Sequence, residues 1–110
     1  MSAVEEIFKD LKDEGGKLVK DEFNSLLNEG LSEKDELIKD NAKKVQEWVL
    51  ALATKKLTPR DFEALIAAQK RKMEQYINTK EIQVRAQAEK LALGLLDLAL
   101  KKVLPLIIPV

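Results

Sequence analysis

The sequence predicts an all-α fold, and three observations support this prediction. The 110 residues contain only four Gly and three Pro. Leu, Ala, Lys, Glu and Gln, which all favour helix, dominate the rest of the chain. Apolar residues recur at spacings of three and four, which places them on one face of each predicted helix. We expect a single helical domain over residues 1–110, because this length buries a core without further cross-links.

The first predicted helix begins near Ser2, where Ser2 and Glu5 match a capping box. Its apolar stripe keeps its phase across Gly15-Gly16, so we expect the helix to continue through this pair. We expect it to end around Asn28, because Gly30 suits the left-handed conformation that closes many helices.

The next two helix starts are marked by capping residues. Ser32 is the predicted N-cap of the second helix, which runs to about Thr54. The third start is the clearest, with Thr58 as N-cap and Pro59 at the first helical position, where proline is favoured. A helix is therefore expected to begin at Pro59.

The length of the third helix decides the architecture. No Gly or Pro interrupts the sequence between Pro59 and Gly94, and the apolar stripe stays in phase. This pattern favours a bundle of three helices whose third is very long, roughly 45 residues and about 70 Å. The alternative is a four-helix bundle in which the third helix breaks at Asn78-Thr79 and Asn78 with Glu81 caps a fourth. Continuity is favoured because neither residue is Gly or Pro.

The C-terminal segment, residues 91–110, is the most apolar part of the chain. Projected at 100° per residue, its apolar side chains surround most of the helix and leave a narrow polar seam. We expect Pro105 to end this helix and an extended apolar tail to follow. The residues predicted to form an interaction surface are Leu91, Leu95, Leu96, Leu98, Leu100, Val103, Leu104, Leu106, Ile107 and Ile108.

This segment suggests a function in assembly. A helix that is apolar on nearly all sides needs more partner surface than two short helices offer, and exposure would leave a large apolar patch. We therefore expect a non-enzymatic structural or interaction protein, either a homo-oligomer or bound to another helical protein. The alternative is a peripheral membrane or lipid-binding protein that lays residues 91–110 on a bilayer.

Composition excludes many sites. The chain has no His and no Cys, so it has no disulfide, no thiolate nucleophile, no Ser-His-Asp triad and no Cys or His zinc site. We predict no catalytic residue, metal, cofactor or small-molecule substrate. The basic run of residues 70–72 is too short for a nucleic-acid surface in a chain with 19 basic and 19 acidic residues. The acidic N-terminus lacks the pattern of a secretory signal, and we expect a cytoplasmic protein.

Overall fold

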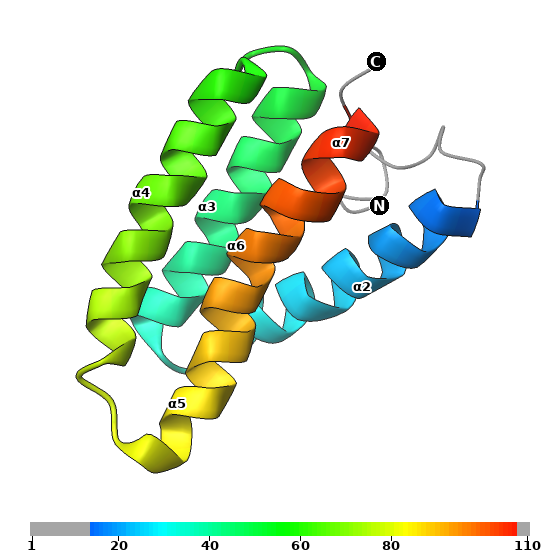
Figure 1. Cartoon of the computed structure of the whole chain (residues 1–110). Helices are drawn as coiled ribbons and strands as arrows, with labels where there is room; N and C mark the ends of the chain where they lie inside the picture. The colour runs from blue at the N-terminus through cyan, green and yellow to red at the C-terminus, as the bar shows by residue number, and fades with distance from the viewer. Residues whose placement is uncertain (1–13, 108–110) are drawn as a thin grey trace.

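The protein is all-helical over the residues that the computed structural model describes, 14–107 (Figure 1). Three helices come first: α2 (Glu14–Leu31), α3 (Glu36–Ala53) and α4 (Pro59–Ile77). A continuous C-terminal helix follows over residues 82–107, divided into α5 (Ile82–Ala88), η1 (Glu89–Gly94), α6 (Leu95–Leu98), η2 (Ala99–Val103) and α7 (Leu104–Ile107). The all-α prediction is confirmed. The helix start predicted at Ser2 and the tail residues 108–110 lie outside the described residues.

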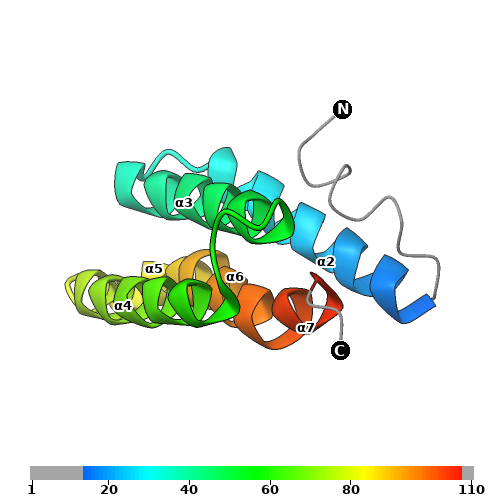
Figure 2. The same ribbon diagram turned by 90° about the horizontal axis from the view of Figure 1, so that it is seen from above.

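The C-terminal helix lies beside α4, α3 lies across from this pair, and α2 crosses obliquely (Figure 1 and Figure 2). Each of the four helical segments contributes apolar side chains to one shared core. Burying a large apolar side chain stabilises the folded state by about 1.5 to 3 kcal/mol relative to leaving it in water. The largest fully buried side chains include Phe23, Leu27, Ile38, Phe62, Ile66, Met73, Ile77, Leu91, Leu95 and Leu96.

The predicted very long third helix is wrong, because α4 ends at Ile77 and α5 begins only at Ile82. The described chain therefore has four helical segments, as in the alternative prediction. The predicted cap of the fourth segment is also wrong. Glu81 occupies the N-cap position with extended backbone, and its side chain makes no capping hydrogen bond. The reversal depends on contacts with α3, described below, which the local sequence does not contain.

The start of α4 confirms the strongest local signal in the sequence. Thr58 is the N-cap, and its hydroxyl accepts a hydrogen bond from the N–H of Asp61 at 3.0 Å. Pro59 is the first helical residue, where its missing N–H costs nothing. Lys55, in the turn before it, adopts φ 65°, the left-handed region that favours glycine.

The predicted boundary between the first two helices is wrong by a few residues. α2 continues to Leu31, and Gly30 is a helical residue that permits a close helix crossing: a Cβ there would lie 2.9 Å from the Cβ of Ala42. The N-cap of α3 is Asp35 rather than Ser32. Gly30 is therefore needed for the approach of α3 and not for closing α2.

The helix also continues through Pro105, which corrects the extended tail predicted from that residue. Pro105 is the second residue of the short segment α7, which directly follows η2. Pro105 lies in the last described turn of the C-terminal helix, where its ring nitrogen cannot donate a hydrogen bond to the preceding turn.

Candidate interaction surface

The structure places most of the predicted interaction residues in the core of the same chain. Six of the ten are buried: Leu91, Leu95, Leu96, Leu98, Val103 and Leu104. Leu100, Leu106 and Ile107 are half-buried, and Ile108 lies outside the described residues. α2, α3 and α4 supply the partners of the buried residues.

One π-helical segment explains part of the spread in the 100° projection. The buried residues form adjacent pairs: Leu91 and Ala92, Leu95 and Leu96, Leu98 and Ala99, Val103 and Leu104. In a uniform α-helix the first three pairs share one face, and the pair of Val103 and Leu104 is rotated away from it. The wider π-helical turn of η2, whose hydrogen bonds reach one residue further, returns this last pair to the same face.

A buried polar network joins three of the helices. The Gln69 amide donates a hydrogen bond to Asn41 Oδ1 at 2.9 Å, and Asn41 Nδ2 donates to the carbonyl oxygen of Ala92 at 3.5 Å. Both side chains are buried. Unpaired polar groups in a core are costly, so this network fixes how α4, α3 and η1 align.

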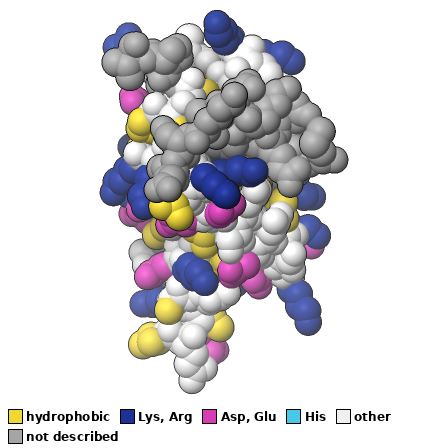
Figure 3. All heavy atoms as spheres, turned by 90° about the vertical axis from the view of Figure 1, so that its right-hand side faces the viewer, with side chains coloured by type: hydrophobic (Ala, Val, Ile, Leu, Met, Phe, Trp, Pro, Cys, Tyr) yellow, Lys and Arg dark blue, Asp and Glu magenta, His cyan; other side chains and the backbone are white. Residues whose placement is uncertain are grey.

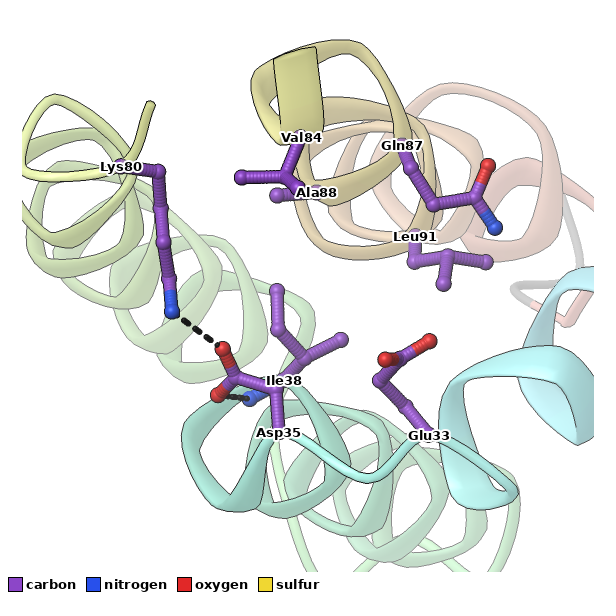
Figure 4. Close-up of a pocket in the computed structure, with 8 residues that line it drawn as sticks. All are labelled: Glu33, Asp35, Ile38, Lys80, Val84, Gln87, Ala88 and Leu91. Carbon is purple, nitrogen blue, oxygen red and sulfur yellow. Dashed lines mark hydrogen bonds and ion pairs between the residues drawn. The ribbon is translucent and has the colours of Figure 1, made fainter. Parts of the chain in front are cut away.

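α5 lies at one end of the molecule (Figure 1). Its first turn carries exposed apolar side chains. Ile82 is 81 % exposed and Val84 is 48 % exposed. Val84 borders a cavity of about 220 Å³ between α5 and the connection that joins α2 to α3 (Figure 4). Eight residues line this cavity: Glu33, Asp35, Ile38, Lys80, Val84, Gln87, Ala88 and Leu91.

One carboxylate at the edge of this cavity ties three parts of the chain together. Asp35 Oδ1 accepts the N–H groups of Leu37 and Ile38 at 3.0 and 3.3 Å and so caps α3. Asp35 Oδ2 accepts the Tyr76 hydroxyl at 2.6 Å and pairs with Lys80 Nζ at 2.7 Å (Figure 4). We call Asp35, Tyr76 and Lys80 the clasp.

The charges of the clasp support each other. Partial burial raises the pKa of the Asp35 carboxyl, but hydrogen bonds from Lys80, Tyr76 and the backbone outweigh this effect, so the pKa lies below its ordinary 3.8. The same hydrogen bond to Asp35, together with the contact with Tyr76, raises the pKa of Lys80. Lys80 Nζ also lies 4.6 Å from the centre of the Tyr76 ring.

Further hydrogen bonds hold the turn of residues 78–81 in its bent form. The Thr79 hydroxyl donates to the carbonyl of Tyr76 at 2.6 Å. Arg85 donates from Nε to the carbonyl of Lys80 at 2.9 Å and from Nη2 to that of Asn78 at 3.2 Å. The bend is therefore maintained by side chains rather than by a residue that prevents helix.

The face where α2 meets the C-terminal helix is polar. Ion pairs join Lys90 to Glu29 at 3.6 Å and Lys102 to Glu22 at 3.5 Å, and all four side chains are exposed. Acidic and basic side chains are mixed over this face, with apolar side chains at the end of the molecule where α5 lies (Figure 3). Exposed pairs of this kind contribute little to stability.

The described part of the chain offers no group of three acidic, His or Cys side chains that could hold a metal ion. Within residues 14–107, none of the helices combines the length and the hydropathy that a membrane crossing requires. No protein-family model, curated protein or solved structure matches this chain.

Sequence reasoning missed the residues at the α5 end. Val84 follows Ile77 by seven residues and so falls on the apolar stripe of the predicted long helix, a position that predicts burial rather than exposure. Asp35 follows the predicted N-cap Ser32 by three residues, and an acidic residue is ordinary in the first turn of a helix. Tyr76 and Lys80, which bind Asp35, are more than 40 residues away from it, so no local sequence pattern indicates this contact. Only a correct prediction of the break after Ile77 could have indicated the clasp.

Proposed function

We propose that the protein is a non-enzymatic helical interaction protein that associates with a second copy of itself through its C-terminal helix. The contact is centred on the α5 end, where Val84 is exposed, rather than on the whole of residues 91–110. The residues further along are already committed to the core of their own chain.

The observation that carries this proposal is the continuity of one apolar stripe. Leu95, Leu91 and Ala88 are buried against the other helices, and Val84 continues the same side of the helix into solvent. The stripe therefore extends beyond the helices that cover it. An apolar position that continues a core stripe and borders a cavity favours a further helical partner.

The charges around Val84 favour a second copy over a strongly charged partner. Glu81, the N-cap of α5, and Arg85 lie one helical turn apart, and Glu33 and Lys80 line the cavity. A surface with both signs close together can pair with itself about a twofold axis, as symmetric dimers require. A nucleic acid or an anionic bilayer would instead favour a basic surface.

The test is the solution mass by light scattering over a range of protein concentrations. We expect the wild-type chain to reach twice the monomer mass of 12.4 kDa. Val84→Glu is expected to remain a monomer with unchanged helical circular dichroism, because Val84 is half exposed and its substitution leaves the core intact.

Leu50→Glu is the matched control. Leu50 is 37 % exposed and lies near the other end of α3, away from the cavity. This variant should dimerise like the wild type. A wild-type chain that stays monomeric at all concentrations would overturn the proposal, and a monomer that floats with anionic liposomes would support the membrane alternative instead.

A further inference from the structure

We propose that the two copies associate by exchanging their C-terminal helices. The turn of residues 78–81 becomes helical, so that α4 and the C-terminal helix form one long helix. Residues 82–107 of each copy then pack against α2, α3 and α4 of the other copy. This inference rests on the proposed self-association and specifies how it is built.

The backbone of the turn is close to helical already. Asn78 has φ −64° and ψ −17°, in the right-handed helical region, whereas Glu81 is extended with φ −64° and ψ 149°. The turn contains neither Gly nor Pro. Within residues 14–107, Lys55 is the one non-glycine residue with positive φ, so the turn holds none. The turn can therefore become helical by rotation about a few backbone torsions, and no residue in it opposes helical φ and ψ angles.

The apolar pattern fits a continuous helix. Ile77, Val84 and Ala88 follow each other at intervals of seven and four residues, which is the spacing of one helix face. In the bent form this pattern is interrupted and Val84 is left half exposed. In a straight helix Val84 would continue the face that Ile77 ends.

In the proposed dimer, the straightened helices of the two copies run antiparallel. The twofold axis passes between residues 80 and 81 of each helix, and the side chains on either side of it are complementary. This axis sets Ile77 opposite Val84 of the second copy and Lys80 opposite Glu81 of the second copy. The exposed valine is then covered. Lys80 gains a new carboxylate in place of Asp35, so the straightened turn loses no charge partner.

Exchange conserves the rest of the packing. The hydrogen bond from Asn41 to the carbonyl of Ala92, the ion pair of Lys70 with Asp97 at 3.1 Å and that of Glu29 with Lys90 each join the C-terminal helix to the other helices. In the exchanged dimer the same contacts form between two copies. The difference in free energy between the two forms is therefore confined to the turn, the new contact about the axis and the cost of association.

The clasp opposes the exchange. Asp35 and Tyr76 hold Lys80 where the chain reverses, and Arg85 binds the carbonyls of two residues within the turn, Asn78 and Lys80. Each of these bonds to the turn is lost when residues 78–81 become helical. The clasp thus sets how readily one copy opens for another.

The test labels the contact between Glu29 and Lys90. The chain has no cysteine, so Glu29→Cys together with Lys90→Cys introduces the only two thiols, on exposed side chains that form an ion pair. The doubly substituted chain is refolded from urea at high concentration, treated with a short bis-maleimide and run on a denaturing gel. We expect a covalent dimer, because exchange places Cys at 29 of one copy beside Cys at 90 of the other.

The matched control is Asp40→Cys with Lys44→Cys. These two residues lie on one helix, with Lys44 Nζ 3.2 Å from Asp40 Oδ2. It should cross-link within one chain in either form. If the Glu29 and Lys90 variant is a dimer by light scattering but cross-links only within chains, exchange is overturned while the proposed self-association stands. A monomer with intrachain cross-links overturns both.

Substitutions in the turn test the same proposal by shifting the equilibrium between the monomer with a bent turn and the exchanged dimer with a helical turn. Asn78→Ala with Thr79→Ala favours helix and should raise the dimerisation constant by up to about a hundredfold, since both copies of the turn benefit. Asn78→Gly with Thr79→Gly should lower it by about tenfold. Equal dimerisation of the two variants would contradict the proposal, because a docked dimer leaves the turn bent.

Discussion

The two reversals on either side of α4 are built in different ways. The turn between α3 and α4 is stabilised by its own residues: Thr58 caps the next helix, Pro59 starts it, and the Thr54 hydroxyl bonds the carbonyl of Leu50. The turn between α4 and α5 is held by Thr79 and Arg85 nearby and also from a distance. Its main anchor, Asp35, is 41 residues from Tyr76 in the sequence.

This difference determines which reversal can open. A turn whose residues cap and start a helix remains bent whatever surrounds it. A turn without Gly or Pro remains bent only while side-chain contacts hold it, and here those of Asp35 come from a distant part of the chain. We therefore expect residues 78–81 to be the part of the described chain that responds most to a change in its partners.

The largest effect is expected when the remote anchor is removed. Asp35→Ala deletes the cap of α3 and the partners of Tyr76 and Lys80, and should lower the free energy of unfolding by about 2 kcal/mol. Urea unfolding followed by circular dichroism measures this change. The N–H groups of Thr79 and Lys80, which bond the carbonyls of Tyr76 and Ile77, should also exchange with solvent much faster.

Asp40→Ala is the control for this variant. Asp40 pairs with Lys44 on the exposed surface of α3, and its loss should change stability by less than about 0.5 kcal/mol. Equal destabilisation by the two substitutions would show that the clasp contributes no more than a surface ion pair.

A smaller effect is expected at the locally stabilised turn. Thr58→Ala removes the acceptor of the Asp61 N–H and should cost about 1 kcal/mol. The faster hydrogen exchange should be confined to the first turn of α4, because no remote contact depends on Thr58 in the described structure. Accelerated exchange at residues 79–81 would contradict the distinction between the two turns.

The smallest effect is expected from acid. The pKa of Asp35 is depressed in the folded chain, so its stabilisation is complete above about pH 4 and is lost as the pH falls through the folded-state pKa. Between pH 7 and pH 3 the urea midpoint of the wild type should fall further than that of Asp35→Asn. Parallel curves for the two proteins would show that the carboxylate charge adds nothing to the clasp.

The C-terminal helix shows a second limit of local reasoning. A regular projection places Leu93, Leu100 and Leu104 away from the face of Leu91, Leu95 and Leu98, and this spread was interpreted as a need for partners outside the chain. The structure leaves Leu93 and Leu100 half-buried, and the π-helical segment η2 brings Leu104 into the core. The stripe stays exposed where it runs past its covering helices, at Val84.

The sequence by itself determined the all-α class, the start of α4 at Pro59 and the absence of His and Cys chemistry. These follow from composition, from residues within one helical turn of each other, and from the period of the apolar stripe. The tertiary structure alone decided that the chain reverses after Ile77, that Gly30 serves a helix crossing and that Asp35 joins three segments. Each of these depends on residues that are distant in the sequence and close in the fold, where packing and remote hydrogen bonds outweigh helix propensities of a few tenths of a kcal/mol per residue.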